Sequence, residues 1–346
     1  MTFAAKEEKI SGKEQGKGEI GFCMVKADLI TGFLGAGKTT FIRKYVTYLL
    51  SQGEKVCILE NDYGAVNVDM MLLSDLKGKN LGIEMVAGGC DYDCHRRRFR
   101  TKLITMAMLG YSRVIIEPSG IFDVDEFFDI LHEDPLDRRY EIGSVLTIVN
   151  ADLEENFTPG TDYMLASQCS QAGRLILSHV QEVDEERIRR TIGHINRALA
   201  SIRCDRSFSL EENVTALDWD MMTGEDLRII SEAGFEETAF EKNFSMDENS
   251  FSSMFFMNIS IPAAQVLANI EKLWKDPDAG NVIRVKGFLA DDPGKNTWIE
   301  VNSTRKGTRV ERIREGQEIL IVIGEGLKED VIDAYFPSRY STTHVR

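Results

Sequence analysis

Hydrophobic and polar positions along the chain form two blocks of different texture. In the first block, short and nearly continuous apolar runs alternate with stretches of helical periodicity. Strands that are apolar on both faces and alternate with helices indicate a mostly parallel sheet that is covered by helices on both sides. One such helix carries Ile42, Val46, Leu49 and Leu50 at positions i, i+4, i+7 and i+8. The predicted strands are Val25–Thr31, Lys55–Glu60, Gly82–Val86, Arg113–Ile116, Gly143–Val149 and Arg174–Leu177.

The second block begins near Phe251 and predicts a small α+β layer. Apolar residues at every second position between 255 and 261 are typical of a half-buried strand. Pro262 fits the first turn of a helix that reaches about Trp274. Three more strands, followed by a final helix at about 328–336, complete this block. The strands are Asn281–Leu289, Thr297–Asn302 and Glu318–Ile323.

The stretch between the two blocks is strongly acidic. Residues 206–250 hold twelve acidic and three basic residues, a net charge of −9. Such a stretch is typical of a solvated linker, and an acidic docking surface for a basic partner is the alternative. We therefore expect a flexible lead-in over 1–24, a nucleotide-binding domain over 25–205, a linker over 206–250 and an α+β domain over 251–346.

Composition narrows the classes of function. The 346 residues carry a net charge of −15, which argues against nucleic acid and anionic membranes as partners. No apolar run approaches the ~18 residues that a membrane span needs. The first 24 residues lack the apolar segment of a signal peptide, so a cytoplasmic location is expected. Four of the six cysteines are scattered singly, which is typical of reduced thiols.

A phosphate-binding motif follows the first predicted strand. Gly32 to Thr39 satisfy G-x-x-x-x-G-K-[ST], and an amphipathic helix begins there. Glycines allow backbone N–H groups to approach phosphates closely, and the positive end of the helix adds to the attraction. Lys38 is expected to bridge the β- and γ-phosphates, and the Thr39 hydroxyl to bind Mg²⁺. The predicted nucleotide-binding residues of this loop are Gly32, Gly35, Ala36, Gly37, Lys38, Thr39 and Thr40.

Two further segments have the residues that hydrolysis needs. Glu117 ends an apolar strand and can hold Mg²⁺ or its water, and Gly120 can donate its N–H to the γ-phosphate; the alternative is a surface turn. Asp62 can reach the same Mg²⁺ ion or orient the attacking water. Its alternative role is an Asx turn before Gly64. Lys38, Asp62 and Glu117 are therefore the candidate catalytic residues of a P-loop nucleotide hydrolase.

Several motifs together resemble the CobW-like family of P-loop GTPase metallochaperones. The loop matches the family pattern G-x-x-G-x-G-K-T-T, and the family's E-x-x-G resembles Glu117 to Gly120. In the second block the family's R-x-K-G-F strand is similar to Arg284-Val285-Lys286-Gly287-Phe288. The family's N-E-F-G and following I-D resemble Asn61-Asp62-Tyr63-Gly64 and Val68-Asp69. The resemblance covers about Val25 to Phe336 and implies hydrolysis coupled to metal delivery, or to servicing of a metal cofactor, in a client enzyme.

The family's metal motif is altered in this chain. Where the family has G-C-x-C-C, residues 89–95 read Gly-Cys-Asp-Tyr-Asp-Cys-His. Cys90, Cys94 and His95 can supply ligands for zinc or a neighbouring first-row metal. Two plain thiols, or a reversible Cys90–Cys94 disulfide, are the alternatives.

The family's guanine motif is altered as well. The pattern N-K-x-D corresponds to Ser178-His179-Val180-Gln181, so a neutral amide replaces the aspartate that accepts the guanine N–H groups. Ser178 and Gln181 are the candidate base-binding residues. GTP is the expected substrate, and ATP stays open.

These features predict a two-domain nucleotide switch with Mg²⁺ as cofactor, GTP or ATP as substrate and zinc or another transition metal as cargo. Its expected partner is a client metalloenzyme or cofactor-dependent protein, and a homodimer can complete the site. One alternative is a nucleotide-gated chaperone, or a reactivase of a cofactor-dependent enzyme such as a corrinoid protein, that carries no metal itself. A small-molecule kinase shares the phosphate loop, but no acceptor-site base or lid segment stands out.

Overall fold

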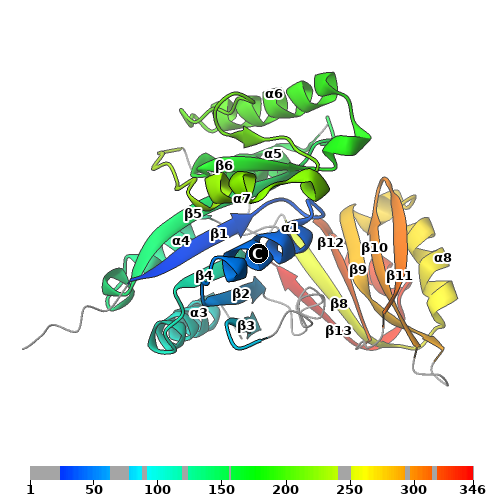
Figure 1. Cartoon of the computed structure of the whole chain (residues 1–346). Helices are drawn as coiled ribbons and strands as arrows, with labels where there is room; N and C mark the ends of the chain where they lie inside the picture. Colours follow the sequence, from blue (N-terminus) through cyan, green and yellow to red (C-terminus); the bar gives the residue numbers. More distant parts are fainter. Residues whose placement is uncertain are drawn as a thin grey trace, which may run out of the picture.

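The fold consists of two separate sheets, each with its own helices (Figure 1). The structure, a computed structural model, describes residues 24–62, 78–87, 92–118, 124–155, 157–240, 251–292, 297–313 and 318–345. Within these ranges no helix is both long and apolar enough to cross a membrane.

The first sheet has seven strands in the order β3-β2-β4-β1-β5-β6-β7, and all neighbouring pairs are parallel. Its carboxyl ends point toward the second sheet in Figure 1. The edge at which parallel strands end is where ligands bind in open α/β sheets. The strands are β1 (Val25–Thr31), β2 (Val56–Asp62), β3 (Leu81–Ala87), β4 (Arg113–Pro118), β5 (Tyr140–Asn150), β6 (Arg174–Ser178) and β7 (Val214–Thr215).

Helices cover this sheet on both faces and give it two cores. One core lies under α1 (Lys38–Ser51) and α7 (Gly224–Ser231), and it includes Phe41, Tyr45 and Ile230. The opposite core lies under α3 (Tyr92–Met108), α4 (Val124–Leu131), α5 (Pro159–Ser170) and α6 (Glu185–Ser201). Short 3-10 turns occur at η2 (Leu136–Arg138), η3 (Val180–Glu182) and η4 (Trp219–Met221).

The second sheet is antiparallel throughout, in the order β11-β10-β9-β12-β8-β13. Helices α8 (Ala263–Leu273) and α9 (Glu329–Asp333) pack over one face and bury Val266, Ile270 and Ile332. A 3-10 turn, η5 (Pro277–Ala279), follows α8. The strands are β8 (Phe251–Ile259), β9 (Asn281–Asp292), β10 (Thr297–Thr304), β11 (Gly307–Ile313), β12 (Ile319–Glu325) and β13 (Ser338–Val345).

The predicted fold class, a mostly parallel P-loop sheet with a small α+β domain, is confirmed, but the acidic stretch needs a correction. Residues 206–240 are part of the first unit rather than a linker, since they form β7 and α7. Phe208 and Val214 enter one core and Leu227 enters the other. Part of the apolar side chains of the stretch is buried, although Leu217, Met221 and Ile229 are exposed, and the many carboxylates hid this packed segment from the analysis of charge. Residues 241–250 lie outside the described residues.

Three smaller differences concern the second unit. Strands β11 and β13 were not predicted, and both are edge strands of their sheet. The side chains of β11 are mostly exposed, so it carries no alternating apolar signal. Pro262 is the N-cap of α8 rather than a residue of its first turn. The final helix is shorter than predicted and spans only Glu329–Asp333.

Candidate functional site

The phosphate loop connects the end of β1 to the start of α1, and its glycines adopt conformations that other residues avoid. Gly32, Gly35 and Gly37 have φ values of 143°, 79° and 95°. At Gly32 a Cβ atom would lie 2.3 Å from the carbonyl oxygen of Ile148 on β5. Only glycine fits such a close approach. The loop is therefore held directly against the neighbouring strand.

Helix α1 begins with its positive end open to an anion. Gly37 is its N-cap and offers no side-chain acceptor, and no acidic residue lies in the first turn. The first N–H groups of a helix lack partners within the helix and attract phosphates. Lys38, only 8% exposed, donates from Nζ to the carbonyl oxygen of Gly32 at 2.9 Å. The ammonium group thus lies across the mouth of the loop, at the backbone of Gly32.

Thr39 and Glu117 come together from different elements, as the sequence predicts. The Thr39 hydroxyl donates to Oε1 of Glu117 at 3.3 Å, and Glu117 is 6% exposed near the end of β4. A hydroxyl and a carboxylate are the hard oxygen donors that Mg²⁺ prefers. These two residues therefore fit a Mg²⁺ ion beside the phosphate loop. Thr40, the next residue of α1, is exposed.

Glu60 adjoins the candidate site, and the sequence analysis did not single it out. It is 1% exposed, and in the parallel pairing of β2 with β4 it stands opposite Glu117. Residues opposite each other across two strands project from the same face. Two adjacent buried carboxylates repel each other unless a cation or a shared proton intervenes. The sequence does show Glu60 as a carboxylate at the end of an apolar run. The same pattern is equally typical of a residue that merely ends a strand.

Several predicted site residues are described only in part or not at all. Asp62 ends β2, where its backbone pairs with Ala87, and its side chain is not among the described ones. Gly120 and Cys90 lie outside the described residues. Cys94 is half-buried and His95 is fully buried in the first turn of α3. Among the residues that the structure describes, no three or more His, Cys, Asp or Glu residues gather as a metal site.

The buried thiols do not extend the predicted metal cluster. Burial raises the pKa of Cys57 to about 12, and burial likewise raises the pKa of Cys169. A thiol must lose its proton to bind a metal ion. Both residues are free thiols within their cores, in agreement with the predicted reduced cysteines.

The arginines after His95 have a carboxylate partner. Because α3 begins at Tyr92, Arg96 lies beyond the first turn of the helix. Its Nη2 lies 2.6 Å from Oε1 of Glu133, and Arg100 approaches the same carboxylate at 3.4 Å. Glu133 is therefore the anionic neighbour of these two arginines.

The predicted base-binding loop adjoins the phosphate loop at one point. Ser178 is buried at the end of β6, and its Cβ lies 3.8 Å from the position that a Cβ of Gly37 would take. Gln181 is exposed within η3. The structure thus brings Ser178 to the start of α1, whereas Gln181 lies at the surface beyond it.

The second unit contacts the phosphate loop directly. Phe33 packs against Phe251, and Leu34 packs against the sheet face formed by Phe255, Phe288, Ile319, Ile321 and Ile323. A Cβ at Gly35 would lie 3.9 Å from Thr304 of β10. The variable residues of the motif are therefore part of an interface between the two sheets.

The R-x-K-G-F strand belongs to the same face. Arg284 stands opposite Ile323, a member of the cluster that contacts Leu34, and its Nε donates to Oδ1 of Asn302 at 3.1 Å. Since side chains alternate along a strand, Lys286 and Phe288 follow on that face. Gly287 points the other way, where a Cβ would lie 2.0 Å from the carbonyl oxygen of Ile319. The motif presents its two cations toward the nucleotide-binding unit.

Comparison with known proteins agrees with this geometry. Residues 26–208 match the family described as CobW/HypB/UreG, nucleotide-binding domain. The chain is 28% identical over 216 residues to "Zinc chaperone YjiA" of Escherichia coli; the match covers 56% of this chain and 65% of that protein, less than two thirds of its length. It is 21% identical over 342 residues to "Zinc chaperone CobW" of Pseudomonas aeruginosa, covering 88% of each.

Among solved structures, that of Zn(II)-bound YjiA GTPase from E. coli aligns with this chain at 18% identity and a TM-score of 0.35. The alignment covers 90% of this chain and 98% of the YjiA chain. The family match spans more than half of the chain and includes the phosphate loop, Glu117 and the loop after β6. The chain belongs to the CobW/HypB/UreG family through its nucleotide-binding domain.

Proposed function

We propose that the protein is a Mg²⁺-dependent GTP hydrolase that acts as a metallochaperone, coupling hydrolysis to delivery of a transition metal to a client protein. The observation that carries the proposal is the contact between Thr39 and Glu117, at 3.3 Å, beside a phosphate loop whose Lys38 lies across its mouth. Membership of the family, and relatives that are called zinc chaperones, support zinc as the leading cargo.

Each residue has a part that follows from its position. The backbone N–H groups from Gly35 to Lys38 bind phosphate oxygens, and Lys38 neutralises charge on the β- and γ-phosphates. Thr39 and Glu117 would hold Mg²⁺, and the ion would supply positive charge against the charge that develops on the transferring group. On the sequence motifs alone, Asp62 would orient the attacking water and Gly120 would donate its N–H to the γ-phosphate.

The topology supports coupling between nucleotide and cargo. The chain leaves β2 after Asp62 and leaves β4 after Pro118, and these strands are neighbours. Cys94 and His95 follow β3, which pairs with β2. Segments at the ends of adjacent strands can order together when the γ-phosphate is present and relax after hydrolysis. Thiolate and imidazole ligands near Cys90 would then change their arrangement with the nucleotide state.

The first experiment tests the enzymatic part of the proposal, separately from metal binding. Hydrolysis of GTP and ATP is measured for the wild type and for Glu117→Gln, with Glu84→Gln as a control because Glu84 is a half-exposed carboxylate paired with Lys102 at 2.6 Å. We expect Glu117→Gln to lower kcat by roughly 10²-fold or more, and the control to retain activity. Equal activity of the two variants would contradict the assigned role of Glu117.

The second experiment titrates zinc and cobalt into the reduced, Mg²⁺-nucleotide-loaded protein and into a Cys90→Ala/Cys94→Ala variant. Stoichiometric binding that is lost in the variant and differs between GTP and GDP supports a carrier gated by the nucleotide. Equal binding by both proteins contradicts the cysteine site. It would favour a nucleotide-gated chaperone that resets a cofactor-dependent client without carrying metal.

A further inference from the structure

We infer that Trp219 forms an aromatic wall of the purine subsite and contacts the base of the bound nucleotide. The inference rests on the proposed nucleotide binding and adds to it a residue that determines which ring is accepted. Trp219 lies in η4, 41 residues beyond Ser178 in the sequence, in the acidic stretch that the sequence alone presents as a linker.

A hydrogen bond fixes the indole beside the predicted base-binding loop. Nε1 of Trp219 donates to the carbonyl oxygen of Leu177 at 2.9 Å. Leu177 immediately precedes Ser178, with which β6 ends. Because the indole has only one donor, this bond sets its position and leaves the ring itself for packing.

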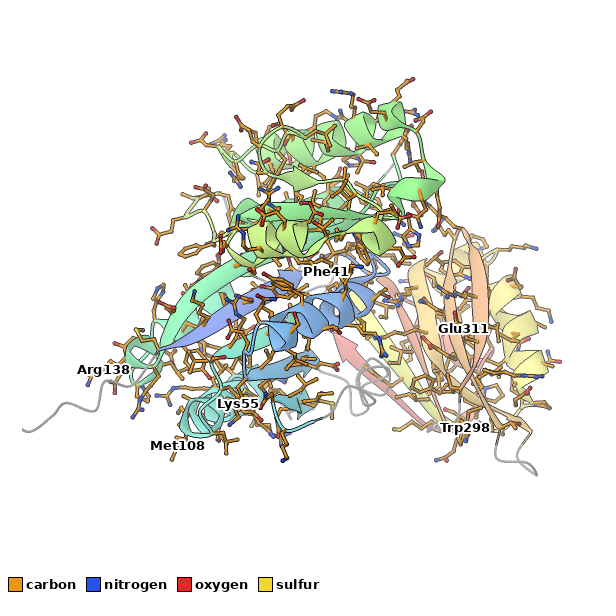
Figure 2. All side chains as sticks on the ribbon, viewed as in Figure 1. Phe41, Lys55, Met108, Arg138, Trp298 and Glu311 are labelled. Carbon is orange, nitrogen blue, oxygen red and sulfur yellow. The ribbon has the colours of Figure 1, made fainter. Side chains whose placement is uncertain are left out.

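The same ring reaches the phosphate loop. Atoms Cη2 and Cζ3 lie 3.2 Å and 3.5 Å from the position that a Cβ of Gly37 would take, and Cβ of Ser178 lies 3.8 Å from it. Phe41, one turn further along α1, meets the indole edge-on at a centroid distance of 5.5 Å and an angle of 62°. Figure 2 labels Phe41 on α1, on the side that faces α7. The indole is therefore held by three segments and half-buried, with part of its surface accessible.

The indole of Trp219 lies where we expect the nucleoside of a bound nucleotide to pass. Phosphates bound by Gly37 and Lys38 lie at the start of α1, and the nucleoside must leave them along the carboxyl edge of the sheet. The loop after β6 borders that path, and Trp219 occupies the corner between this loop and α1. A planar indole at this corner suits a planar base, since stacking on an aromatic side chain is favourable for every base.

The charged groups of the loop after β6 also favour recognition of the base by stacking on the indole rather than by hydrogen bonds to the edge of the base. His179 has a left-handed backbone, with φ of 57°, and its Nδ1 lies 2.8 Å from Oε1 of Glu182. This contact engages the Glu182 carboxylate. The remaining candidate to hydrogen-bond with the edge of the base is the neutral amide of Gln181. Without charge assistance, the edge of the base contributes less to selectivity than stacking does. Purines should therefore bind better than pyrimidines, with GTP and ATP within about tenfold of each other.

The test compares ligands with and without a base. Binding of GTP, ATP, UTP and inorganic triphosphate, each with Mg²⁺, is measured for the wild type, Trp219→Ala and Trp219→Phe. Trp274→Ala is the matched control, because its Nε1 makes a similar bond, at 2.8 Å to Ser303 in the second unit. We expect Trp219→Ala to weaken GTP and ATP by roughly ten- to hundredfold, Trp219→Phe by less than about threefold, and neither to change the binding of triphosphate.

Other outcomes decide between the possible roles of the indole. Equal losses for GTP and triphosphate in Trp219→Ala would overturn the inference, because the indole would then only support the phosphate loop. Unchanged GTP binding would overturn it as well. If the wild type binds neither GTP nor triphosphate, the proposed function itself fails together with this inference.

A spectroscopic readout covers the case in which Trp219→Ala does not fold. In a Trp274→Phe/Trp298→Phe background, Trp219 is the remaining tryptophan of the chain. GTP and ATP should then change its fluorescence, and inorganic triphosphate should not. A spectrum that responds equally to all three ligands would contradict contact with the base.

Discussion

At the residue scale, a buried group of polar side chains lies toward the amino ends of the central strands of the first sheet, where Arg113 begins β4. Asp28 is fully buried on β1, and its Oδ2 accepts hydrogen bonds from Arg113 at 2.7 Å and from the Tyr45 hydroxyl at 2.8 Å. The backbone N–H of Ser144 donates to Oδ1 at 2.9 Å. Burial, with Asp28 adding to it, raises the pKa of Tyr45 well above its ordinary value, so its hydroxyl stays a donor. The network joins β1, β4, β5 and α1.

Removing the carboxylate from this network should be costly. Asp28→Ala removes the nearer of two carboxylates from the buried Arg113 cation and leaves Glu54 at 3.6 Å, and we expect a loss of about 3 kcal/mol in the free energy of unfolding. Tyr45→Phe removes one of the bonds and should cost about 1 kcal/mol. Urea denaturation of both variants measures the difference. Equal losses in the two would show that the charge pair is not the dominant contribution.

The thiols provide a second test at this scale. Because burial raises the pKa of Cys57 to about 12, this thiol stays protonated at pH 8 and enclosed in its core. We expect neither Cys57 nor Cys169 to react with a thiol reagent in the folded protein, and both to react after denaturation. Peptide mapping of the labelled protein identifies the modified cysteines. Rapid labelling of Cys57 in the native state would contradict the described packing.

The site residues divide into those that local sequence determines and those that depend on the fold. The phosphate loop could be predicted because Gly32, Gly37 and Lys38 form it within one short segment, in which their spacing is fixed. The meeting of Thr39 with Glu117 was also predictable, since Thr39 lies just after the carboxyl end of β1 and Glu117 at the carboxyl end of β4 in one parallel sheet. The positions of Glu60 and Trp219 were not, because each becomes significant only through pairing with a segment far away in the sequence.

At the scale of elements, helix α5 begins at a junction of the two units. Thr158 is its N-cap, and the hydroxyl oxygen accepts from the backbone N–H of Thr161 at 3.1 Å while the hydroxyl donates to Oε2 of Glu325 at 2.8 Å. Glu325 ends β12 of the second sheet. An anion near the first turn of a helix is favourable. One threonine thus starts a helix and fixes a carboxylate of the other unit.

Two capping threonines allow these contributions to be separated. Thr158→Ala should lower the free energy of unfolding by about 1 kcal/mol and also weaken the contact between the units. Thr223→Ala, which removes the N-cap of α7 within a capping box, should cost about the same without that second effect. Chemical denaturation measures the free energy of unfolding. The rate of limited proteolysis between residues 241 and 250 measures the strength of the contact between the units. Similar proteolysis rates in both variants would contradict the role of Thr158 at the interface.

Elements were predictable where apolar periodicity was strong. All six strands expected in the first block exist, because each contains an apolar run; the central strands are buried on both faces, whereas the edge strand β3 has Gly82, Glu84 and Met85 half-buried. Strand β11 escaped prediction because its exposed edge position removes the need for apolar side chains. Strand β7 has only two residues and lies within a stretch whose charge suggested a linker.

At the scale of the whole molecule, the contact of Leu34 with the second sheet offers a way to test the switch. Leu34→Ala removes part of the apolar contact with the cluster around Phe255 and Ile321. Leu50→Ala is a matched control, because Leu50 is also partly buried but packs on the far end of α1. We expect each variant to lose roughly 1–2 kcal/mol of stability, and only Leu34→Ala to change the affinity for GTP relative to GDP. Equal affinity ratios in the two variants would contradict coupling through the loop.

A second contact between the units depends on pH. Asp152 forms ion pairs with Arg187 of its own unit, at 2.7 Å, and with Lys306 of the second unit. The hydrogen bond from Lys306, and secondarily Arg187, lowers the pKa of Asp152 below its ordinary value of 3.8. A lowered pKa contributes stability that is complete above the ordinary value and is lost as the pH falls through the lowered one.

The corresponding variant is Asp152→Asn. Its stability should fall below that of the wild type at pH 6–7, and the difference should shrink as the pH drops below about 3.8, as measured by urea denaturation. Because Asp152 is 41% exposed, solvent and salt should reduce the difference further. A difference that grows toward low pH would contradict the direction of the pKa shift.

The insertion of Phe33 and Leu34 into the second unit has a consequence for how such chains can be recombined. These two positions lie inside a nucleotide-binding motif, yet their neighbours include Phe251 and Ile283 of the other sheet. The choice of these two side chains therefore depends on the apolar surface of the second unit as well as on the phosphate loop. A chimera that joins this first unit to the second unit of another protein should dock properly only if residues 33 and 34 are exchanged together with it.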